Sequence, residues 1–176
     1  MSLVVRNASE ADIPAITAIY AAEVRDFVNT YEYEAPGEAE MLGRMRNMLA
    51  GGYPYLAAEL DGEVVGYAYA GSFRSRAAYR WVVENSVYVA AGRQGKGIGS
   101  ALLQRLIEEC AARDFRQMIA VIGEPTNTAS IKLHQRFGFT SLATFPAIAW
   151  KHGRWLDTVF MQRALGAGKA QPASGN

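Results

Sequence analysis

Reactive and metal-binding side chains are scarce in this sequence. Its 176 residues include one cysteine and two histidines, so a disulfide within the chain is excluded. The two histidines lie far apart, with no clustered ligands around them, and this fits no usual metal-site pattern. Cys110 lies on the apolar side of a helical pattern, which favours a packed core thiol over a reactive one.

Long apolar runs and an excess of charge of one sign are missing as well. No run approaches the length of a membrane span, and the N-terminus turns polar by Arg6, too soon for a signal peptide. The sequence therefore predicts a cytoplasmic protein without a membrane partner. The formal net charge is +1, which gives no strong overall attraction to nucleic acid. Any charge that binds a ligand must be local.

The order of the apolar patterns predicts a mixed α/β fold. Strands are expected at residues 3–6, 53–60, 63–70, 81–90, 117–122, 140–151 and 155–162. Helices are expected from Ser9, over 38–49, from the glycine-rich segment 92–99 through Ala112, and over 128–137. The Asp61-Gly62 pair between two apolar runs is a strong hairpin signal. The elements thus follow the order β-α-α-β-β-β-α-β-α-β-β.

No internal repeat or linker divides this pattern. Residues 1–165 are expected to form one domain, because two domains would each be small at this length. Residues 166–176 are rich in Gly, Ala, Pro and Ser, and a segment so small and polar is predicted to be a flexible tail.

The glycine-rich loop before the third helix is the most informative segment. It reads Gln94-Gly95-Lys96-Gly97-Ile98-Gly99-Ser100. Free backbone N–H groups and the helix dipole bind phosphate at such a helix start, and Lys96 adds a positive charge. The dinucleotide pattern G-x-G-x-x-G fails at Ser100 and Leu102, and the P-loop pattern lacks its Gly-Lys-Ser or Gly-Lys-Thr. A loop that merely caps the helix is the alternative.

The pattern that remains, Gln94-x-x-Gly97-x-Gly99, resembles the pyrophosphate loop of the GNAT superfamily of N-acetyltransferases. The resemblance spans nearly all of residues 3–163. It implies the GNAT fold, a mixed and mostly antiparallel central sheet flanked by helices, with acetyl-coenzyme A (acetyl-CoA) as co-substrate and no metal. The cofactor contacts that it implies are Val87, Tyr88, Val89, Gln94, Gly95, Lys96, Gly97, Ile98, Gly99, Ser100, Asn127 and Ser130.

Three more segments, residues 79–89, 121–127 and 151–157, resemble the phosphinothricin and methionine sulfoximine acetyltransferase branch of that superfamily. This resemblance implies acetylation of the α-amine of a small anionic substrate such as phosphinothricin, methionine sulfoximine or methionine sulfone. It also implies a homodimer. Apolar residues near the last strands could form the dimer contact or equally belong to the core: Trp150, Trp155, Phe160 and Met161.

Glu84 is the candidate general base. An amine attacks a thioester only when neutral, and a model α-amino group has a pKa of about 8, so a carboxylate must take its proton. Strand alternation places Glu84 on one face with Ser86 and Tyr88, and the resemblance gives Glu84 the position of the proposed base. The alternative is an exposed strand carboxylate paired with Arg80 or a neighbour.

His134 is the second candidate. Many superfamily members carry a tyrosine there, assigned to protonate the departing thiolate, whereas this chain has histidine, as the phosphinothricin branch does. Because a thiol has a pKa of about 8.5, the thiolate leaves readily and acid help matters less than base help. His134 is therefore expected to act as acid or base, or to have a structural role. His152, in a predicted turn, is expected to be structural.

Residues 73–80, which we call the arginine loop, contain three arginines and two aromatics and precede the fourth strand. Arginine forks match carboxylate and phosphinate groups in two-point contacts. The resemblance implies that this loop holds the anionic end of the substrate, with aromatic help from the inter-helix segment. The substrate contacts that it implies are Tyr31, Phe73, Arg74, Arg76, Tyr79 and Val121. A solvated arginine loop with no ligand is the alternative.

Two other functions stay open. A protein N-terminal or lysine acetyltransferase of the same fold would need an open peptide groove, whereas the Tyr31 segment and the arginine loop are expected to close the pocket. A non-catalytic module that senses acetyl-CoA would not need both Glu84 and His134. An assay of thiol release separates this module from an enzyme.

Overall fold

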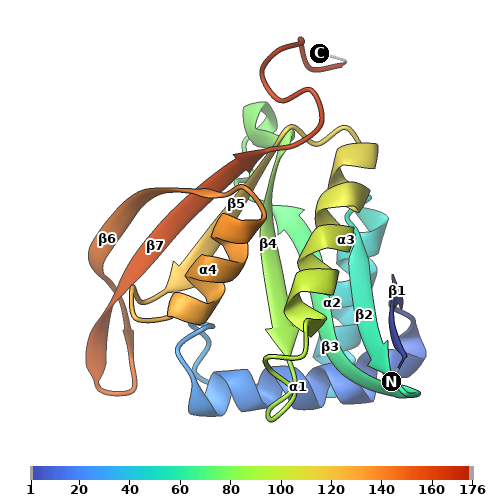
Figure 1. Ribbon diagram of the computed structural model, residues 1–176. Helices are drawn as coiled ribbons and strands as arrows, with labels where there is room; N and C mark the ends of the chain where they lie inside the picture. The colour runs from blue at the N-terminus through green and yellow to red at the C-terminus, as the bar shows by residue number, and fades with distance from the viewer. Residues whose placement is uncertain (1, 175–176) are drawn as a thin grey trace.

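A seven-stranded sheet organises the chain, and the computed structural model describes residues 2–174 (Figure 1). The strands are β1 (Leu3–Asn7), β2 (Tyr55–Leu60), β3 (Glu63–Ser72), β4 (Val82–Val89), β5 (Gln117–Gly123), β6 (Thr140–Lys151) and β7 (Arg154–Ala164). The helices are α1 (Ile13–Asp26), α2 (Glu38–Ala50), α3 (Ile98–Ala112) and α4 (Thr128–Arg136). The strand order is β1-β2-β3-β4-β5-β7-β6, and every neighbouring pair except β4 and β5 is antiparallel.

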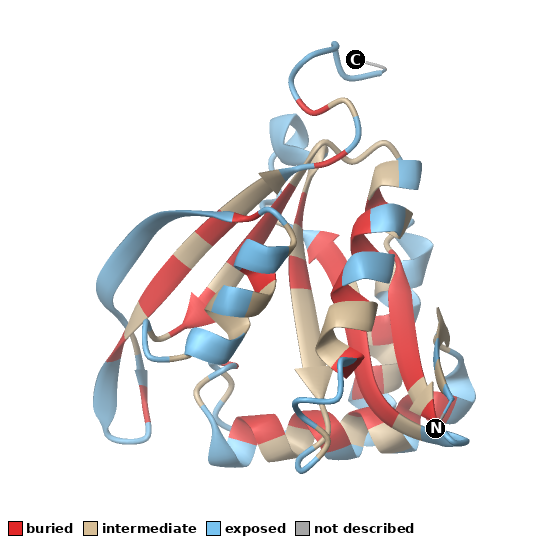
Figure 2. Cartoon of the chain, viewed as in Figure 1, coloured by how far each residue is buried: buried red, intermediate tan, exposed pale blue. Residues whose placement is uncertain are grey.

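Helices cover both faces of the sheet and bury two separate apolar cores. The first core joins α3 to the strands through fully buried side chains such as Leu102, Leu106 and Leu56, and α4 packs against it. The second joins α1 and α2 to the other face, around Ile16 and Met45. Burying one such side chain stabilises the fold by about 1.5–3 kcal/mol. The central strands β2 and β3 are accordingly buried along most of their length (Figure 2).

Cys110 belongs to the first core. Its side chain is fully buried, and burial raises the pKa of its thiol to about 12. The predicted core position of Cys110 is confirmed.

The sheet divides between β4 and β5, and this division creates the site. The two strands run parallel, but their register extends only from Val82↔Gln117 to Glu84↔Ile119. Beyond Glu84, β4 leads into the glycine loop, while β5 continues beside β7 (Figure 1). Where the two strands diverge, their main-chain N–H and C=O groups no longer pair with each other and can form hydrogen bonds to other partners.

The predicted fold and element order are confirmed, and the boundaries shift by a few residues. The helix expected from Ser9 starts with a short 3₁₀ turn, Glu10–Asp12, before α1. Ser9 and Asp12 form a capping box, with Ser9 N 2.7 Å from Asp12 Oδ2. Asp61 and Gly62 both have positive φ, as a tight hairpin turn requires.

The described part of the C-terminal segment contacts the domain. Arg116 donates hydrogen bonds to the carbonyl oxygens of Gly168 and Pro172, and Ser174 donates one to Asp114. The flexibility expected for residues 166–176 stays a prediction, and part of that segment lies outside the described residues. Within residues 2–174, no helix has the length and apolar character needed to cross a membrane.

Candidate active site

The gap between β4 and β5 holds a cavity of about 850 Å³, which we call the cleft cavity. It is lined by α1, the 27–31 segment that follows α1, β4, β5 and α4. Its polar lining residues are Tyr20, Glu23, Asn29, Thr30, Tyr31, Tyr69, Glu84, Asn85, Ser86, Tyr88, Gln94, Asn127, Ser130 and His134. A second cavity of about 360 Å³, the loop cavity, lies between the glycine loop and α4. Val89, Gln94 and Gly99 line both cavities, so the two adjoin.

Glycines give the loop before α3 its shape. Gly95 and Gly97 have φ angles of +77° and +79°, in the left-handed region that costs other residues about 1–2 kcal/mol. Gly97 is the N-cap of α3, so the first N–H groups of that helix have no partner within it. Gly97, Ile98 and Gly99 all line the loop cavity. Free amides and the positive end of the helix dipole attract an anion here.

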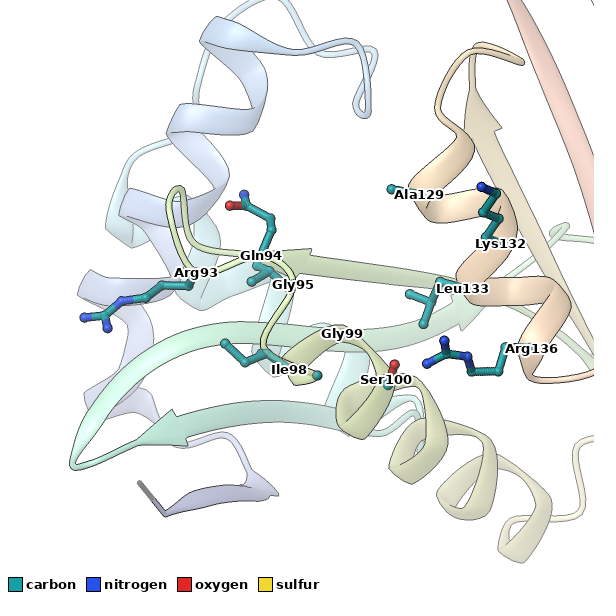
Figure 3. Close-up of a pocket in the computed structure, with 12 residues that line it drawn as sticks. Arg93, Gln94, Gly95, Ile98, Gly99, Ser100, Ala129, Lys132, Leu133 and Arg136 are labelled. Carbon is teal, nitrogen blue, oxygen red and sulfur yellow. The ribbon is translucent and has the colours of Figure 1, made fainter.

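Two cations of α4 add to this anion site. Lys132 and Arg136 line the loop cavity from the side opposite the glycine loop, and the Arg136 guanidinium points toward Ser100 (Figure 3). Arg93 also lines this cavity, but its side chain points away from α4 and pairs with Glu63. The loop cavity thus combines backbone amides with two positive side chains, which is the chemistry of a phosphate or pyrophosphate site.

Glu84 lies at the end of the β4–β5 pairing and lines the cleft cavity. Burial raises its pKa above the ordinary value, and the positive charge of Arg74 lowers it by a smaller amount. A carboxylate with a raised pKa binds a proton more strongly, which suits a general base working near neutral pH.

His134 also lines the cleft cavity, but both of its ring nitrogens already have partners. Nδ1 lies 2.8 Å from the carbonyl oxygen of Ser130, and Nε2 lies 3.0 Å from Oδ1 of Asn85. The ring is 4% exposed. Burial lowers the pKa of His134, and the Ser130 carbonyl partly offsets this effect.

A buried lysine holds the 27–31 segment against the sheet. Lys151 donates from Nζ to the carbonyl oxygens of Phe27 and Thr30, at 2.9 Å and 2.7 Å. The hydroxyl of Tyr31 is hydrogen-bonded to that of Thr158 on β7. The segment therefore forms a fixed wall of the cleft cavity rather than a free loop.

Asparagines continue this wall to α4. Asn127 accepts a hydrogen bond from the backbone N–H of Ser130 at 3.2 Å, which caps α4, and its Nδ2 donates to Asn29 at 3.0 Å. Asn29 in turn donates to the carboxylate of Glu23 at 2.6 Å. Burial raises the pKa of Glu23. Asn127 thus joins the start of α4 to the segment that contains Tyr31.

The arginine loop lies beside the cleft cavity rather than in its lining. Arg74 stacks over the Phe73 ring at 5.2 Å, and Phe73 meets Tyr79 edge-on at 6.0 Å. Phe73, Arg74, Arg76 and Tyr79 are absent from the described lining of both cavities. Arg74 nevertheless lies close enough to Glu84 to lower its pKa.

Comparison with known proteins agrees with this geometry. The family described as Acetyltransferase (GNAT) family matches residues 16–139, more than half of the chain. The chain belongs to the GNAT acetyltransferase family.

Individual relatives of this GNAT enzyme cover almost its whole length. It is 46% identical to phosphinothricin N-acetyltransferase from Alcaligenes faecalis, over 93% of this chain and 83% of the relative. It is 40% identical to L-methionine sulfoximine/L-methionine sulfone acetyltransferase from Pseudomonas aeruginosa, over 98% and 100%. The crystal structure of a phosphinothricin acetyltransferase from Sinorhizobium meliloti in complex with acetyl-CoA superposes with a TM-score of 0.96 at 48% identity, over 100% of this chain and 95% of the other.

Most of the predicted site residues of this GNAT chain come together in the two cavities. The residues found in the described linings are Tyr31, Glu84, Val87, Tyr88, Val89, Gln94, Gly95, Gly97, Ile98, Gly99, Ser100, Val121, Asn127, Ser130 and His134. Lys96 lies outside both linings, and so do the four predicted substrate contacts of the arginine loop: Phe73, Arg74, Arg76 and Tyr79. The individual roles of all these residues stay predictions.

Sequence reasoning missed the cations of α4, although their signal was present. Ala129, Lys132, Leu133 and Arg136 follow the i, i+3, i+4, i+7 spacing of one helix face, and all four line the loop cavity. Tyr20, Glu23 and Asn85 in the cleft cavity were also missed. Their directions depend on how α1 and β4 pack, which no local pattern specifies.

Proposed function

We propose that this GNAT chain transfers an acetyl group from acetyl-CoA to the α-amine of a small, anionic, amino-acid-like substrate. The observation that carries the proposal is a desolvated carboxylate, Glu84, in a cavity that adjoins an anion-binding glycine loop. The relatives named for phosphinothricin and methionine sulfoximine support this substrate class. We place the reaction in the cytoplasm, as the sequence predicts.

The loop cavity fits the pyrophosphate of acetyl-CoA. The amides at the start of α3 would hold its oxygens together with Lys132 and Arg136. Bound there, acetyl-CoA supplies an acetyl thioester, a reactive acyl group. Gln94 and Val89, which line both cavities, mark the passage between the phosphate site and Glu84.

Glu84 removes the proton that keeps the substrate amine unreactive. A model α-amine has a pKa of about 8, so most of it is protonated near neutral pH. Glu84 accepts this proton, directly or through a water, and the neutral nitrogen attacks the acyl carbon. The carbon–sulfur bond then breaks, and the second proton that the nitrogen loses neutralises the departing thiolate, so that the products are an amide and a free thiol. General base help of this kind contributes about 10²–10⁴ in rate. Because the pKa of Glu84 is raised, it lies closer to the pKa of the amine.

The sequence left three roles open for His134: acid, base or structural. We assign it the structural role. Neither ring nitrogen reaches a substrate or a thiolate unless it first breaks its bond to Ser130 or Asn85. Because a thiolate with a pKa of about 8.5 leaves readily, the reaction has little need of an acid at this position.

Amine-dependent thiol release tests the proposal against a sensing module. Purified protein is mixed with acetyl-CoA and methionine sulfone, and free thiol and N-acetylated product are both measured. The proposal predicts equal amounts of the two, appearing at many turnovers per enzyme. Tight acetyl-CoA binding without acetylated product would instead indicate a sensor.

Arg74 is proposed to bind the anionic end of the substrate and to tune the base. Removing its positive charge in Arg74→Ala raises the pKa of Glu84, because Arg74 lowers it in the folded protein. Since Glu84 works only when ionised, the acid limb of the kcat/KM pH profile should move to higher pH. Arg76→Ala is the matched control and should leave that limb in place. Identical limbs in wild type and Arg74→Ala would contradict the assignment.

A homodimer is proposed through the outer face of β6 and β7. β6 is an edge strand that is exposed along almost its whole length (Figure 2). Apolar side chains nevertheless cover it: Leu142, Phe145, Ile148, Trp150 and, on β7, Trp155, which is 62% exposed. Met161 is core, and Phe160 packs against Phe145. An exposed apolar patch on an open edge favours a protein partner, and the implied homodimer supplies a second copy.

Trp155→Glu should break this dimer, because it places a charge at the centre of an apolar contact. Sedimentation velocity at micromolar concentration should show a dimer for wild type and a monomer for the variant. Val4→Glu, an exposed apolar position on β1 at the opposite end of the sheet, should remain dimeric. A monomeric wild type, or a dimeric Trp155→Glu, would contradict the assignment.

A further inference from the structure

Asn85 lies where β4 and β5 separate. The last registered pair of these strands is Glu84↔Ile119, one residue before it. The side-chain Nδ2 of Asn85 donates to the carbonyl oxygen of Ile119 at 3.1 Å. A side chain thus replaces the main chain as the partner of β5 at the point where the cleft begins. Asn85 is buried, so this hydrogen bond is shielded from solvent.

The same amide also reaches α4. Its Oδ1 lies 3.0 Å from Nε2 of His134, whose Nδ1 lies 2.8 Å from the Ser130 carbonyl oxygen. The His134 and Phe139 rings also pack at nearly right angles, with centroids 4.9 Å apart. One buried chain of hydrogen bonds therefore ties β5, β4 and α4 together at the apex of the cleft.

Donors and acceptors along this chain fix the positions of its hydrogens. The carbonyls of Ile119 and Ser130 only accept, so Asn85 must present its NH₂ group to β5 and His134 must carry a hydrogen on Nδ1. Asn85 then presents its oxygen to Nε2 of His134, and this contact is a hydrogen bond only if Nε2 also carries a hydrogen. A neutral ring would place a lone pair against an oxygen.

We propose that Asn85 is a positioning residue that fixes the apex of the cleft and, with the Ser130 carbonyl, stabilises His134 with a hydrogen on both ring nitrogens. The link to catalysis rests on the proposed function. The hydrogen-bonded chain itself does not.

Asn85 supplies the second oxygen within hydrogen-bond distance of the His134 ring, beside the Ser130 carbonyl. The charged side chains of the adjoining elements are Glu84 on β4, and Lys132 and Arg136 on α4, while β5 has none. The pKa of His134 responds to burial and to the Ser130 carbonyl, and to no charged neighbour. Burial opposes the proton and lowers the pKa of His134, and the two acceptors oppose that effect only in part.

Changing the Asn85 acceptor should therefore change proton binding at His134. Asn85→Asp has nearly the same shape and adds a negative charge beside Nε2, so it should raise the proton-binding constant of His134 at least tenfold. Asn85→Leu removes the acceptor and should lower that constant about tenfold. The two variants should shift the titration in opposite directions.

Imidazole ¹H–¹⁵N NMR titration of the protein without acetyl-CoA measures this directly. The chain has two histidines, so His152→Gln in every sample leaves the His134 signals alone. The proposal predicts that Asn85→Asp raises and Asn85→Leu lowers the pH at which the His134 ring loses its second nitrogen-bound hydrogen. If both variants titrate like wild type, the proposal is wrong. If Asn85→Leu fails to fold, Asn85→Asp decides alone. Because no turnover is measured, this result is independent of the proposed enzymatic activity.

Discussion

Replacing Glu84 by glutamine should reduce kcat by about 10²–10⁴ near neutral pH, the usual contribution of a positioned general base. Glutamine keeps the size and polarity of the side chain but cannot accept the amine proton. The loss should shrink as the pH rises past about 8, where the substrate amine becomes neutral without help. Initial rates of thiol release across the pH range, at saturating acetyl-CoA, measure both effects.

Two controls make this result specific. Glu108→Gln introduces the same change on the exposed face of α3 and should leave kcat unchanged. Glu84→Asp retains a carboxylate one methylene farther back and should recover part of the rate. If Glu84→Gln keeps the wild-type pH–rate profile, Glu84 is not the base. Its burial and raised pKa would then reflect packing alone.

Gly97→Val should raise the KM for acetyl-CoA about tenfold or more. Gly97 has a φ of +79°, and a β-branched residue rarely adopts that angle. The strain, about 1–2 kcal/mol, is relieved only if the loop moves. A moved loop no longer points its amides into the loop cavity, and about 1.4 kcal/mol corresponds to tenfold in binding. KM and an independent calorimetric Kd for acetyl-CoA measure the change.

Gly52→Val is the matched control for Gly97→Val. Gly52 has nearly the same angle, a φ of +80°, just after α2, and it is absent from the described linings of both cavities. Its side chain would also have open space, as at Gly97. Both variants should lose similar thermal stability, but only Gly97→Val should lose affinity. An unchanged Kd in Gly97→Val would contradict the assignment of the loop to the cofactor.

Much of the fold was readable from the sequence because its signals are local. The Asp61-Gly62 turn, the capping box at Ser9 and the glycine loop each act within a few residues, and the structure contains all three. The alternation of apolar residues then marks where the strands lie along the chain. These signals say which residues form elements, and the elements follow the predicted order.

The parts of the site that the sequence did not reveal depend on long-range packing. Lys151 holds the 27–31 segment from a position more than a hundred residues later in the chain. Asn85 looked like an ordinary strand residue, and only the divergence of β4 from β5 gives its amide two partners. The arginine loop was expected to face the substrate, yet it lies outside the described cavity linings. No pattern within a single element specifies these directions.

One measurement tests the central claim most directly: kcat/KM for acetyl transfer to a panel of amines. The panel contains methionine sulfone, methionine sulfoximine, phosphinothricin, the carboxamide of methionine sulfone, a polyamine and a short peptide. The account predicts efficient turnover of the first three and a loss of at least tenfold for the carboxamide, which keeps the amine but lacks the negative charge. Preferential turnover of the peptide or polyamine would leave the fold and the cofactor site standing but contradict the proposed substrate.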